Sequence, residues 1–213
     1  DAFGDCTPGN GNNTGSTLTE NADPVLGGIQ SMKYEFDNDG TVYSPCTMNQ
    51  EGSHLQYSRI EAQTATLPSG IGSNWTVGGV KALYLAFHGL AGNPVTENLW
   101  VQLKSGASYG SKVFYGDFEG ESLDDFNEAS WHDWYIDLAD FGVALSNVTS
   151  IVIGIGNEDG SGAHGSGTLY FDEIRLYAPM CMPQRAKPAA DFDNSCQVDY
   201  PDIEVFFNHW LAG

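Results

Sequence analysis

Residues 82–87 read Ala82-Leu83-Tyr84-Leu85-Ala86-Phe87, a short run in which large apolar side chains recur at every second position. Alternation with a period of two is typical of a β-strand that buries one face. Clusters of Gly, Asn, Pro and Asp separate this run from others and favour turns between them. The other runs of this kind are 32–36, 99–103, 112–115, 134–138, 151–155 and 168–176.

About seven or eight such strands predict an all-β protein, and this number suits a two-sheet jelly-roll β-sandwich. The strands fall within residues 28–178, and about 150 residues are enough to build such a core. We therefore expect three parts: an extended N-terminal segment (1–27), the sandwich (28–178), and a C-terminal segment (179–213) with a short calcium loop and a helix.

The N-terminal segment 1–27 consists largely of Gly, Asn, Thr and Ser with hardly an apolar anchor. A segment of this composition cannot offset the entropy that it loses on ordering. It therefore needs a disulfide, its own domain or another copy of the chain to hold it. An extended segment can add as a strand to the sheet edge of a neighbour, and the alternative is that it wraps its own sandwich.

Residues 191–202 read Asp-Phe-Asp-Asn-Ser-Cys-Gln-Val-Asp-Tyr-Pro-Asp and carry oxygen atoms at the spacing of a calcium loop. Ca²⁺ takes about six to eight oxygen ligands, and such a loop supplies a backbone carbonyl at its seventh position. The loop has Cys196 where glycine is usual and ends on Asp rather than Glu, and the alternative is a metal-free acidic turn. The predicted ligands are Asp191, Asp193, Ser195, the carbonyl of Gln197, Asp199 and Asp202.

A helical pattern follows this loop. Its apolar residues make a stripe that must pack against something, and they are Ile203, Phe206, Phe207, Trp210 and Leu211. A short carboxylate at the end of the loop is usual in dockerins. The segment 190–211 therefore resembles one half of a dockerin whose second half is absent.

The charge balance excludes several partners. The chain has 28 acidic and 8 basic residues and a net charge of -20, which would repel nucleic acid and anionic membranes. No apolar run approaches the length of about 20 residues that a membrane-spanning helix needs. We expect no nucleic-acid partner and no membrane insertion.

The four cysteines indicate the compartment. They allow three pairings, and their sequence neighbours suggest Cys6 with Cys46 and Cys181 with Cys196. Two disulfides imply an oxidising compartment, which agrees with a calcium loop working outside the cell. We expect an extracellular or cell-surface protein, and four free thiols in a cytosolic protein are the alternative.

Three Asn-x-Ser/Thr sequons are candidate glycosylation sites, at Asn12, Asn74 and Asn147. Turn-forming neighbours should keep each amide at the surface. Such triplets also arise by chance, so unmodified asparagines remain an equal alternative.

The strands also carry a family resemblance. The order Gly27-Gly28-Ile29-Gln30-Ser31-Met32, Ser73-Asn74-Trp75-Thr76, Trp131-His132-Asp133-Trp134 and the run from Gly167 to Tyr177 resembles a galactose-binding-like jelly roll. Such domains look like carbohydrate-binding modules and recur in secreted proteins of planctomycete-type bacteria. The resemblance covers about residues 25–177, and the fold it implies hosts many unrelated functions.

The resemblance implies one further metal ligand. In that family the closing strand often lends an Asp to a structural calcium ion, which would here be Asp172. Its partners would lie among Glu35, Asp37 and Asp39. The alternative is that Asp172 simply faces outward on an edge strand.

Binding of a sugar would require exposed aromatic rings that stack on a pyranose face. The glycan-stacking candidates are Trp75, Trp131 and Trp134, with Trp100, Tyr57, Tyr109 and Tyr115 as further aromatic residues. For any one of them a place in the core is the commoner role, because large aromatic side chains usually bury most of their surface.

The sequence offers no catalytic constellation. The five histidines are scattered without metal-ligand spacing, and no Gly-x-Ser-x-Gly motif is present. We therefore expect a non-enzymatic protein that self-associates through its terminal segments, for example as a subunit of a glycosylated surface layer or fibre. The alternative is a carbohydrate-binding module that recognises a polysaccharide, and a polysaccharide-degrading enzyme is a second alternative.

Overall fold

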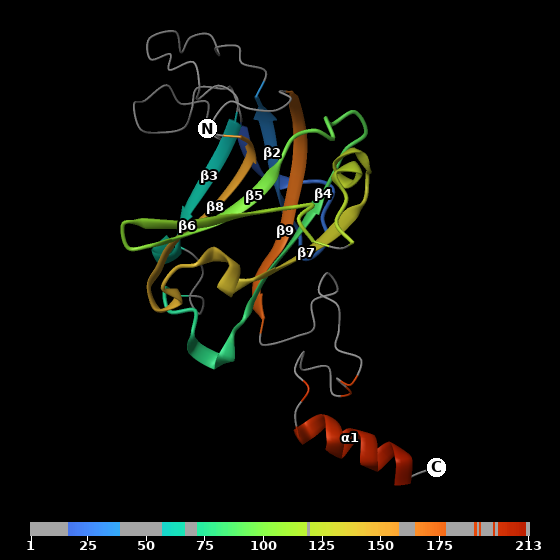
Figure 1. Cartoon of the computed structure of the whole chain (residues 1–213). Helices are drawn as coiled ribbons and strands as arrows, with labels where there is room; N and C mark the ends of the chain where they lie inside the picture. The colour runs from blue at the N-terminus through green and yellow to red at the C-terminus, as the bar shows by residue number, and fades with distance from the viewer. Residues whose placement is uncertain are drawn as a thin grey trace.

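A computed structural model of the chain describes residues 17–38, 57–66, 72–118, 120–157, 165–177 and 200–211, together with Ala190, Phe192 and Val198. Its strands form two antiparallel sheets packed face to face (Figure 1). The five-stranded sheet contains β1 (Thr17–Ala22), β2 (Ser31–Asp37), β9 (Ser166–Tyr177), β4 (Ala82–His88) and β7 (Trp131–Asp137), in that order. The four-stranded sheet contains β3 (Tyr57–Gln63), β8 (Val148–Gly156), β5 (Leu99–Ser105) and β6 (Ser108–Phe114), in that order.

The prediction of an all-β, two-sheet sandwich is confirmed. Each run that the sequence analysis identified overlaps a strand of the structure. The strand β1 lies within the segment 1–27 and pairs with β2 of the same chain, with Thr17 opposite Glu35. The described part of this segment therefore extends its own sheet, and residues 1–16 lie outside the described residues.

The core lies between the sheets and is built by alternation along each strand. On β4, Leu83, Leu85 and Phe87 point inward and are at most 1% exposed. They meet apolar residues of β5 and β8 on the facing sheet, such as Val101 and Ile153. Because burial of each such side chain contributes roughly 1.5–3 kcal/mol, this face fixes the orientation of the strands.

The strand β9 contains a β-bulge. Along β4, Ala86 pairs with Asp172 and Tyr84 pairs with Arg175, so that two residue steps on β4 oppose three steps on β9. Glu173 lies in the bulge with a φ of 54°, a left-handed conformation that is rare outside glycine. The extra residue changes which side chains of β9 face outward.

A buried polar cluster ties β2, β9 and the β4–β5 connection together at one end of the sandwich. Gly165 N–H donates to Glu97 Oε1 at 2.7 Å, and Asn38 Nδ2 donates to Glu97 Oε2 at 3.1 Å. The hydroxyl of Ser58, on β3, donates to Asn38 Oδ1 at 2.7 Å. Burial raises the pKa of the Glu97 carboxyl to about 7, although both hydrogen bonds favour its ionised form.

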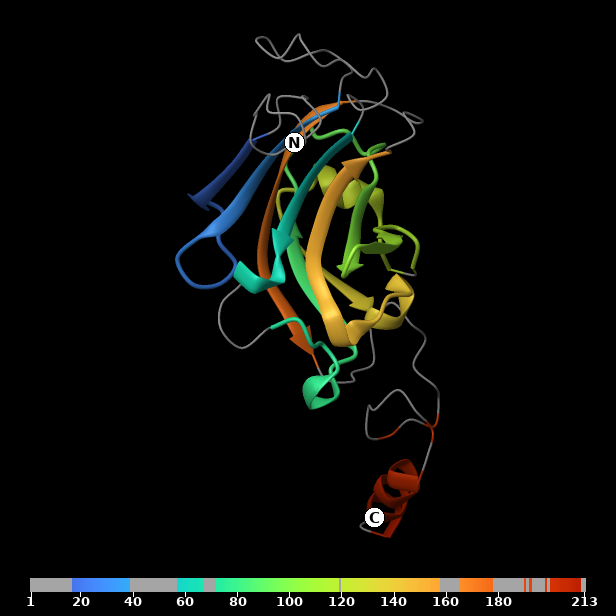
Figure 2. The ribbon, with the colours of Figure 1, turned by 90° about the vertical axis from the view of Figure 1, so that its left-hand side faces the viewer.

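The C-terminal helix α1 (Tyr200–Leu211) was expected from the apolar stripe and is present. Figures 1 and 2 draw it away from both sheets. Its large apolar side chains are exposed, with Trp210 at 68% and Phe207 at 52%. Among the described residues, none of the helices combines the length and the apolar character needed to cross a bilayer.

We predict that Glu97 makes the stability of the sandwich depend on pH. Its pKa is raised in the folded state above the ordinary value of 4.5, so its stabilising effect is complete below about pH 4.5 and is lost as the pH rises through about 7. The free energy of unfolding of the wild type should therefore fall relative to that of the Glu97→Gln variant when the pH is raised from 4.5 to 8. The change in the difference between the two proteins should be on the order of 3 kcal/mol.

Urea unfolding of both proteins at the two pH values measures this difference. The control is Asp124→Asn, which removes an exposed carboxylate. A free-energy difference between Glu97→Gln and wild type that stays constant with pH would contradict the prediction.

Candidate functional site

Aromatic side chains cover the outer face of the five-stranded sheet. Because alternate residues of β4 face the core, Tyr84 and His88 face outward. The residues paired with them across the sheet face the same side, and they are Tyr135 and Trp131 on β7 and Tyr170 on β9. After the bulge, Tyr177 joins this face beside Ala82. We call the set the outer aromatic face, and its members are Tyr84, His88, Trp131, Tyr135, Tyr170 and Tyr177.

The rings form two groups, which are separated by the row of residues paired across β7, β4 and β9 at Ala86. In the first group, the ring of His88 lies 5.3 Å from that of Trp131 and 6.0 Å from that of Tyr170, both edge to face. In the second group, the ring of Tyr84 lies 4.8 Å from that of Tyr135 and 5.7 Å from that of Tyr177. Asp133 and Asp172 occupy the row between the groups, on either side of Ala86.

The rings at the centre of the face are more buried than those at its edge. Tyr84, His88 and Tyr170 are each 8% exposed, whereas Trp131 and Tyr135, on the edge strand β7, are partly exposed. The central rings therefore support the edge rings from behind. Trp131 and Tyr135 present the surface that a ligand can reach, about 13 Å apart along the strand at about 3.3 Å per residue.

Asp133 adds a hydrogen-bonding group to this surface. It is exposed, and its Oδ1 accepts a hydrogen bond from the Tyr84 hydroxyl at 2.7 Å. Burial, followed by this hydrogen bond, raises the pKa of Tyr84 well above its usual range. Burial and then the charge of Asp133 also raise the pKa of Tyr135. Both phenols are therefore protonated donors at neutral pH.

His88 is uncharged at neutral pH for a similar reason. Burial lowers the pKa of its imidazole, and the nearby His132 lowers it further. Burial thus favours the uncharged forms of both Tyr84 and His88.

Asp172 serves a backbone role. Its Oδ2 accepts hydrogen bonds from the N–H groups of Leu26 and Gly27, each at 3.0 Å, and its Oδ1 accepts one from Glu173 N–H at 2.7 Å. Both carboxylate oxygens therefore hold the β1–β2 loop and the bulge of β9 in place.

The calcium partners predicted for Asp172 are not brought to it. Glu35 pairs with Thr168 and Asp37 pairs with Ser166, which are four and six residues away along β9. At about 3.3 Å per residue, these carboxylates start about 13 Å and 20 Å from Asp172. The antiparallel register thus separates the set, and Asp39 lies outside the described residues.

The three tryptophans predicted as stacking candidates have different positions. Trp75 is 2% exposed and donates its indole N–H to the carbonyl of Gly72, and Trp134 is 0% exposed in the core, so both are removed from the candidates. Trp131 lies on the outer aromatic face. Alternation explains the contrast, because residues 131 and 134 differ by an odd number of steps along β7 and face opposite sides.

The other aromatic candidates lie on or next to the second sheet. Trp100 is 0% exposed and lies flat over Gly154, where a Cβ atom would stand 2.1 Å from the indole ring, and Lys112 Nζ covers it at 3.9 Å from the ring centroid. Tyr57 and Tyr115 are also buried. Tyr109, on β6, is 43% exposed.

Sequence reasoning missed four tyrosines of the outer aromatic face: Tyr84, Tyr135, Tyr170 and Tyr177. The first three stand at alternate positions to core residues within runs that the sequence identified as strands. That alternation was the available signal. Tyr177 could not be found in this way, because the bulge at Glu173 changes which side of β9 the following residues face.

Of the predicted calcium loop, the structure describes Phe192, Val198 and residues 200–202, and Asp202 is the one predicted ligand among them. The carboxylate of Asp202 is 2% exposed, and its Oδ1 accepts a hydrogen bond from Phe192 N–H at 2.6 Å. The last carboxylate therefore folds back onto the second residue of the loop. The other predicted ligands lie outside the described residues, and they are Asp191, Asp193, Ser195, Gln197 and Asp199.

Two of the predicted sequons are at the surface. Asn74 and Asn147 are exposed, and Asn74 Oδ1 accepts hydrogen bonds from Thr76 N–H at 3.1 Å and from its hydroxyl at 2.6 Å. The side chains of Asn74 and Asn147 are therefore accessible at the surface, as a glycosylation site requires. Asn12 and the four cysteines, Cys6, Cys46, Cys181 and Cys196, lie outside the described residues.

A pocket of about 320 Å³ lies elsewhere on the molecule, between β6 and the loop that follows it. Its lining includes Phe114, Tyr115, Leu123 and the carboxylate of Asp117. Its lining contains two aromatic residues, Phe114 and Tyr115, and Tyr115 is buried, so the pocket offers less stacking surface than the outer aromatic face.

Searches with family models and against curated proteins found no match. Among solved structures, the chain is similar to a β-1,2-glucanase from Parabacteroides distasonis, with a TM-score of 0.53 and 12% identity over 76% of this chain and 22% of that one. This likeness shows the fold, a β-sandwich that spans less than a quarter of the glucanase.

Carbohydrate-binding modules also appear among the similar structures. One is described as a carbohydrate-binding module of the β-sandwich superfamily (TM-score 0.44, 11% identity, 76% of this chain and 53% of that one). Another is a family 30 carbohydrate-binding module of a cellulosomal cellulase of Clostridium thermocellum (TM-score 0.46, 11% identity, 76% and 82%).

Proposed function

We propose that this protein is a non-catalytic module that binds a polysaccharide on its outer aromatic face. The observation that carries the proposal is the pair of partly exposed rings, Trp131 and Tyr135, backed by Tyr84 and His88 and flanked by Asp133. Aromatic faces stack on the C–H face of a pyranose, and carboxylates and phenols hydrogen-bond its hydroxyl groups.

The rigidity of this face favours binding. Both exposed rings stand on one strand of a hydrogen-bonded sheet, and each contacts a buried ring behind it: Trp131 contacts His88, and Tyr135 contacts Tyr84. Little side-chain entropy is therefore lost when a sugar stacks on them. A ligand that reaches both rings must extend along β7, which favours a chain of sugars over a single one.

Charge selects the kind of polysaccharide. A protein with a net charge of -20 repels polymers of uronic or sulfated sugars. The exposed carboxylate of Asp133 beside the rings acts in the same direction. We therefore propose a neutral polysaccharide as the ligand.

A second candidate function, self-association, is favoured by helix α1. Ile203, Phe206, Phe207 and Trp210 are between 37% and 68% exposed along one helix. Apolar surface of this kind is costly in water, and an identical helix from a second copy offers a matching apolar surface. A fibre or layer subunit would use such a contact.

We also propose that calcium binds at residues 191–202. Asp202, the last of the predicted ligands, is turned back toward the start of the loop, as convergence of ligands on one ion requires. Calcium supplies charge neutralisation to a loop rich in carboxylates. Together with the two disulfides predicted from the sequence, a calcium site would suit a protein that works outside the cell.

For polysaccharide binding, we expect Trp131→Ala and Tyr135→Ala each to weaken affinity about tenfold or more, because each removes one stacking surface. Pull-down on a panel of insoluble neutral polysaccharides, followed by calorimetry with a soluble fragment, measures this. The matched control is Tyr109→Ala, which removes an exposed ring from the other sheet and should leave affinity unchanged. Failure of the wild type to bind any polymer would refute the proposal.

For self-association, we expect the wild-type chain to form oligomers in multi-angle light scattering. The double variant Phe207→Asp, Trp210→Asp should be monomeric because it places charge in the apolar stripe. Asn208→Asp, which adds one charge to the same helix about 130° from the centre of the stripe, should behave like the wild type. A wild-type protein that is monomeric across the accessible concentrations would exclude this function.

For calcium, we expect a chelator to lower the melting temperature of α1 and its loop, because an ion that binds only the folded state stabilises it by mass action. At about 100 times its dissociation constant the ion contributes about 2.7 kcal/mol. Far-UV circular dichroism and calcium titration calorimetry measure the two effects. The Asp202→Asn variant should lose both responses, and identical melting of the wild type with calcium and with chelator would count against the site.

A further inference from the structure

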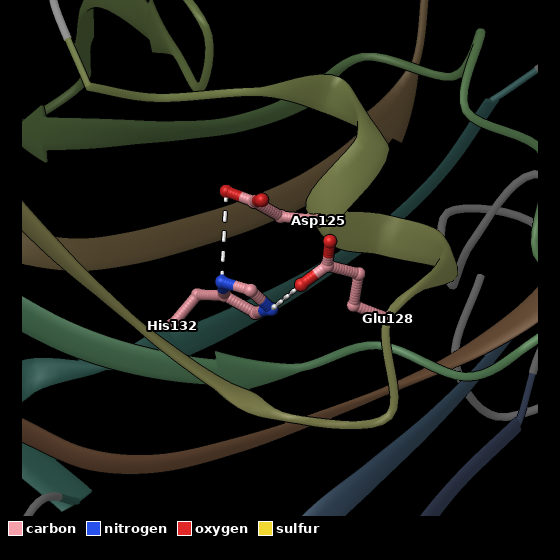
Figure 3. Close-up of side chains that lie close together, drawn as sticks. All are labelled: Asp125, Glu128 and His132. Carbon is pink, nitrogen blue, oxygen red and sulfur yellow. Dashed lines mark ion pairs between the residues drawn. The ribbon is translucent and has the colours of Figure 1, made fainter.

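Three side chains capable of binding a transition metal converge near the start of β7. Asp125 lies in the 3₁₀ helix Leu123–Asn127, Glu128 follows that helix, and His132 is the second residue of β7. In Figure 3, the two carboxylates approach opposite ends of the imidazole ring. Each of the three residues offers a ligand atom within 4.8 Å of the others.

The two ring nitrogens face different partners. His132 Nδ1 lies 3.6 Å from Asp125 Oδ2, and His132 Nε2 lies 3.9 Å from Glu128 Oε2. The hydroxyl of Ser130 lies 2.9 Å from Nε2. One ion takes the lone pair of one nitrogen, so Nε2 can serve an ion together with Glu128 while Nδ1–H points to Asp125.

The inner side of this arrangement is held in place by its surroundings. The imidazole of His132 stacks on the ring of Phe87, with 5.3 Å between centroids and an angle of 26°. The Tyr115 hydroxyl donates a hydrogen bond to Asp125 Oδ2. A ligand histidine usually donates its second N–H to a carboxylate, which orients the ring. Asp125 Oδ2 faces His132 Nδ1 at 3.6 Å, just beyond hydrogen-bond range, so a small approach of the two side chains would form this bond.

The outer side is open and adjustable. The side chain of Glu128 is 60% exposed, whereas those of His132 and Asp125 are each 16% exposed. Ligands about 2.0–2.1 Å from a tetrahedral zinc ion stand about 3.3 Å from each other, so Glu128 must move by only about half an ångström. Solvent can fill the remaining positions.

We propose that His132 Nε2 and Glu128 bind a divalent transition-metal ion such as Zn²⁺, and that Asp125 is a positioning residue that acts through His132 Nδ1. An imidazole nitrogen beside a carboxylate is a donor set for zinc and similar ions, whereas calcium prefers oxygen ligands alone. The Ser130 hydroxyl competes for the same lone pair and is displaced by the ion. This site shares no residue with the predicted calcium loop and does not depend on sugar binding.

The test is calorimetric titration of the full chain with ZnCl₂ in excess calcium, which occupies the C-terminal loop. We expect the wild type to bind zinc and both Glu128→Gln and His132→Gln to lose this binding. Asp125→Asn should weaken it about 10- to 100-fold, as is typical when an orienting partner is removed. The matched control Asp124→Asn removes an exposed neighbouring carboxylate and should bind zinc as the wild type does.

One further measurement and one exposed variant keep the outcome clear. Zinc should shift the Nε2 signal of His132 in ¹⁵N nuclear magnetic resonance more than its Nδ1 signal. Glu128 is exposed, so its variant should fold even if the His132 variant does not. Unchanged zinc affinity in Glu128→Gln, or a wild type whose His132 signals do not respond to zinc, would overturn the proposal.

Discussion

Burial of the inner faces of the two sheets is the constraint on which the rest of the structure depends. Once Leu83, Leu85 and Phe87 point into the core, the intervening side chains of β4 have one direction left. A shift of β4 by one residue in its pairing with the neighbouring strands would expose these three side chains and bury Tyr84 and His88 in apolar surroundings. The outer aromatic face is therefore a by-product of core packing, and its positions are as firmly fixed as those of the core.

The strand β7 links the two proposed binding sites. Trp131 faces outward to the polysaccharide surface, and the next residue, His132, faces inward to Phe87 and to the two carboxylates. Adjacent residues of a strand always point to opposite sides. One short segment thus supplies a stacking ring to one surface and a metal ligand to another. Because Trp131 lies between Glu128 and His132 in the chain, an ion that fixes these two residues would also restrict Trp131.

The sequence was sufficient to predict the sandwich, because short runs rich in apolar and aromatic residues are separated by clusters of turn-forming residues along the chain. It was also sufficient to predict α1, whose apolar residues recur at helical spacing. It could not predict which tryptophans are exposed, because Trp131 and Trp134 have similar neighbours and only the sheet decides which of them faces the core. Nor could it predict the role of Asp172, whose partners Leu26 and Gly27 lie about 145 residues earlier and reach it only through the pairing of β2 with β9.

The extra residue in β9 has a consequence for how this protein tolerates change. Before Glu173 the even-numbered side chains of the strand face outward, and after it the odd-numbered ones do. Substitutions in this stretch alter one side chain at a time. Loss of Glu173 itself would remove the bulge, and the remaining residues would alternate without interruption, so that Leu176 would still face the core and Tyr177 would still face outward. Loss of a residue elsewhere in the strand would leave the bulge in place and turn the side chains beyond the deletion to the opposite face. The bulge is therefore the one place in this stretch where the strand can lose a residue and keep both of its faces.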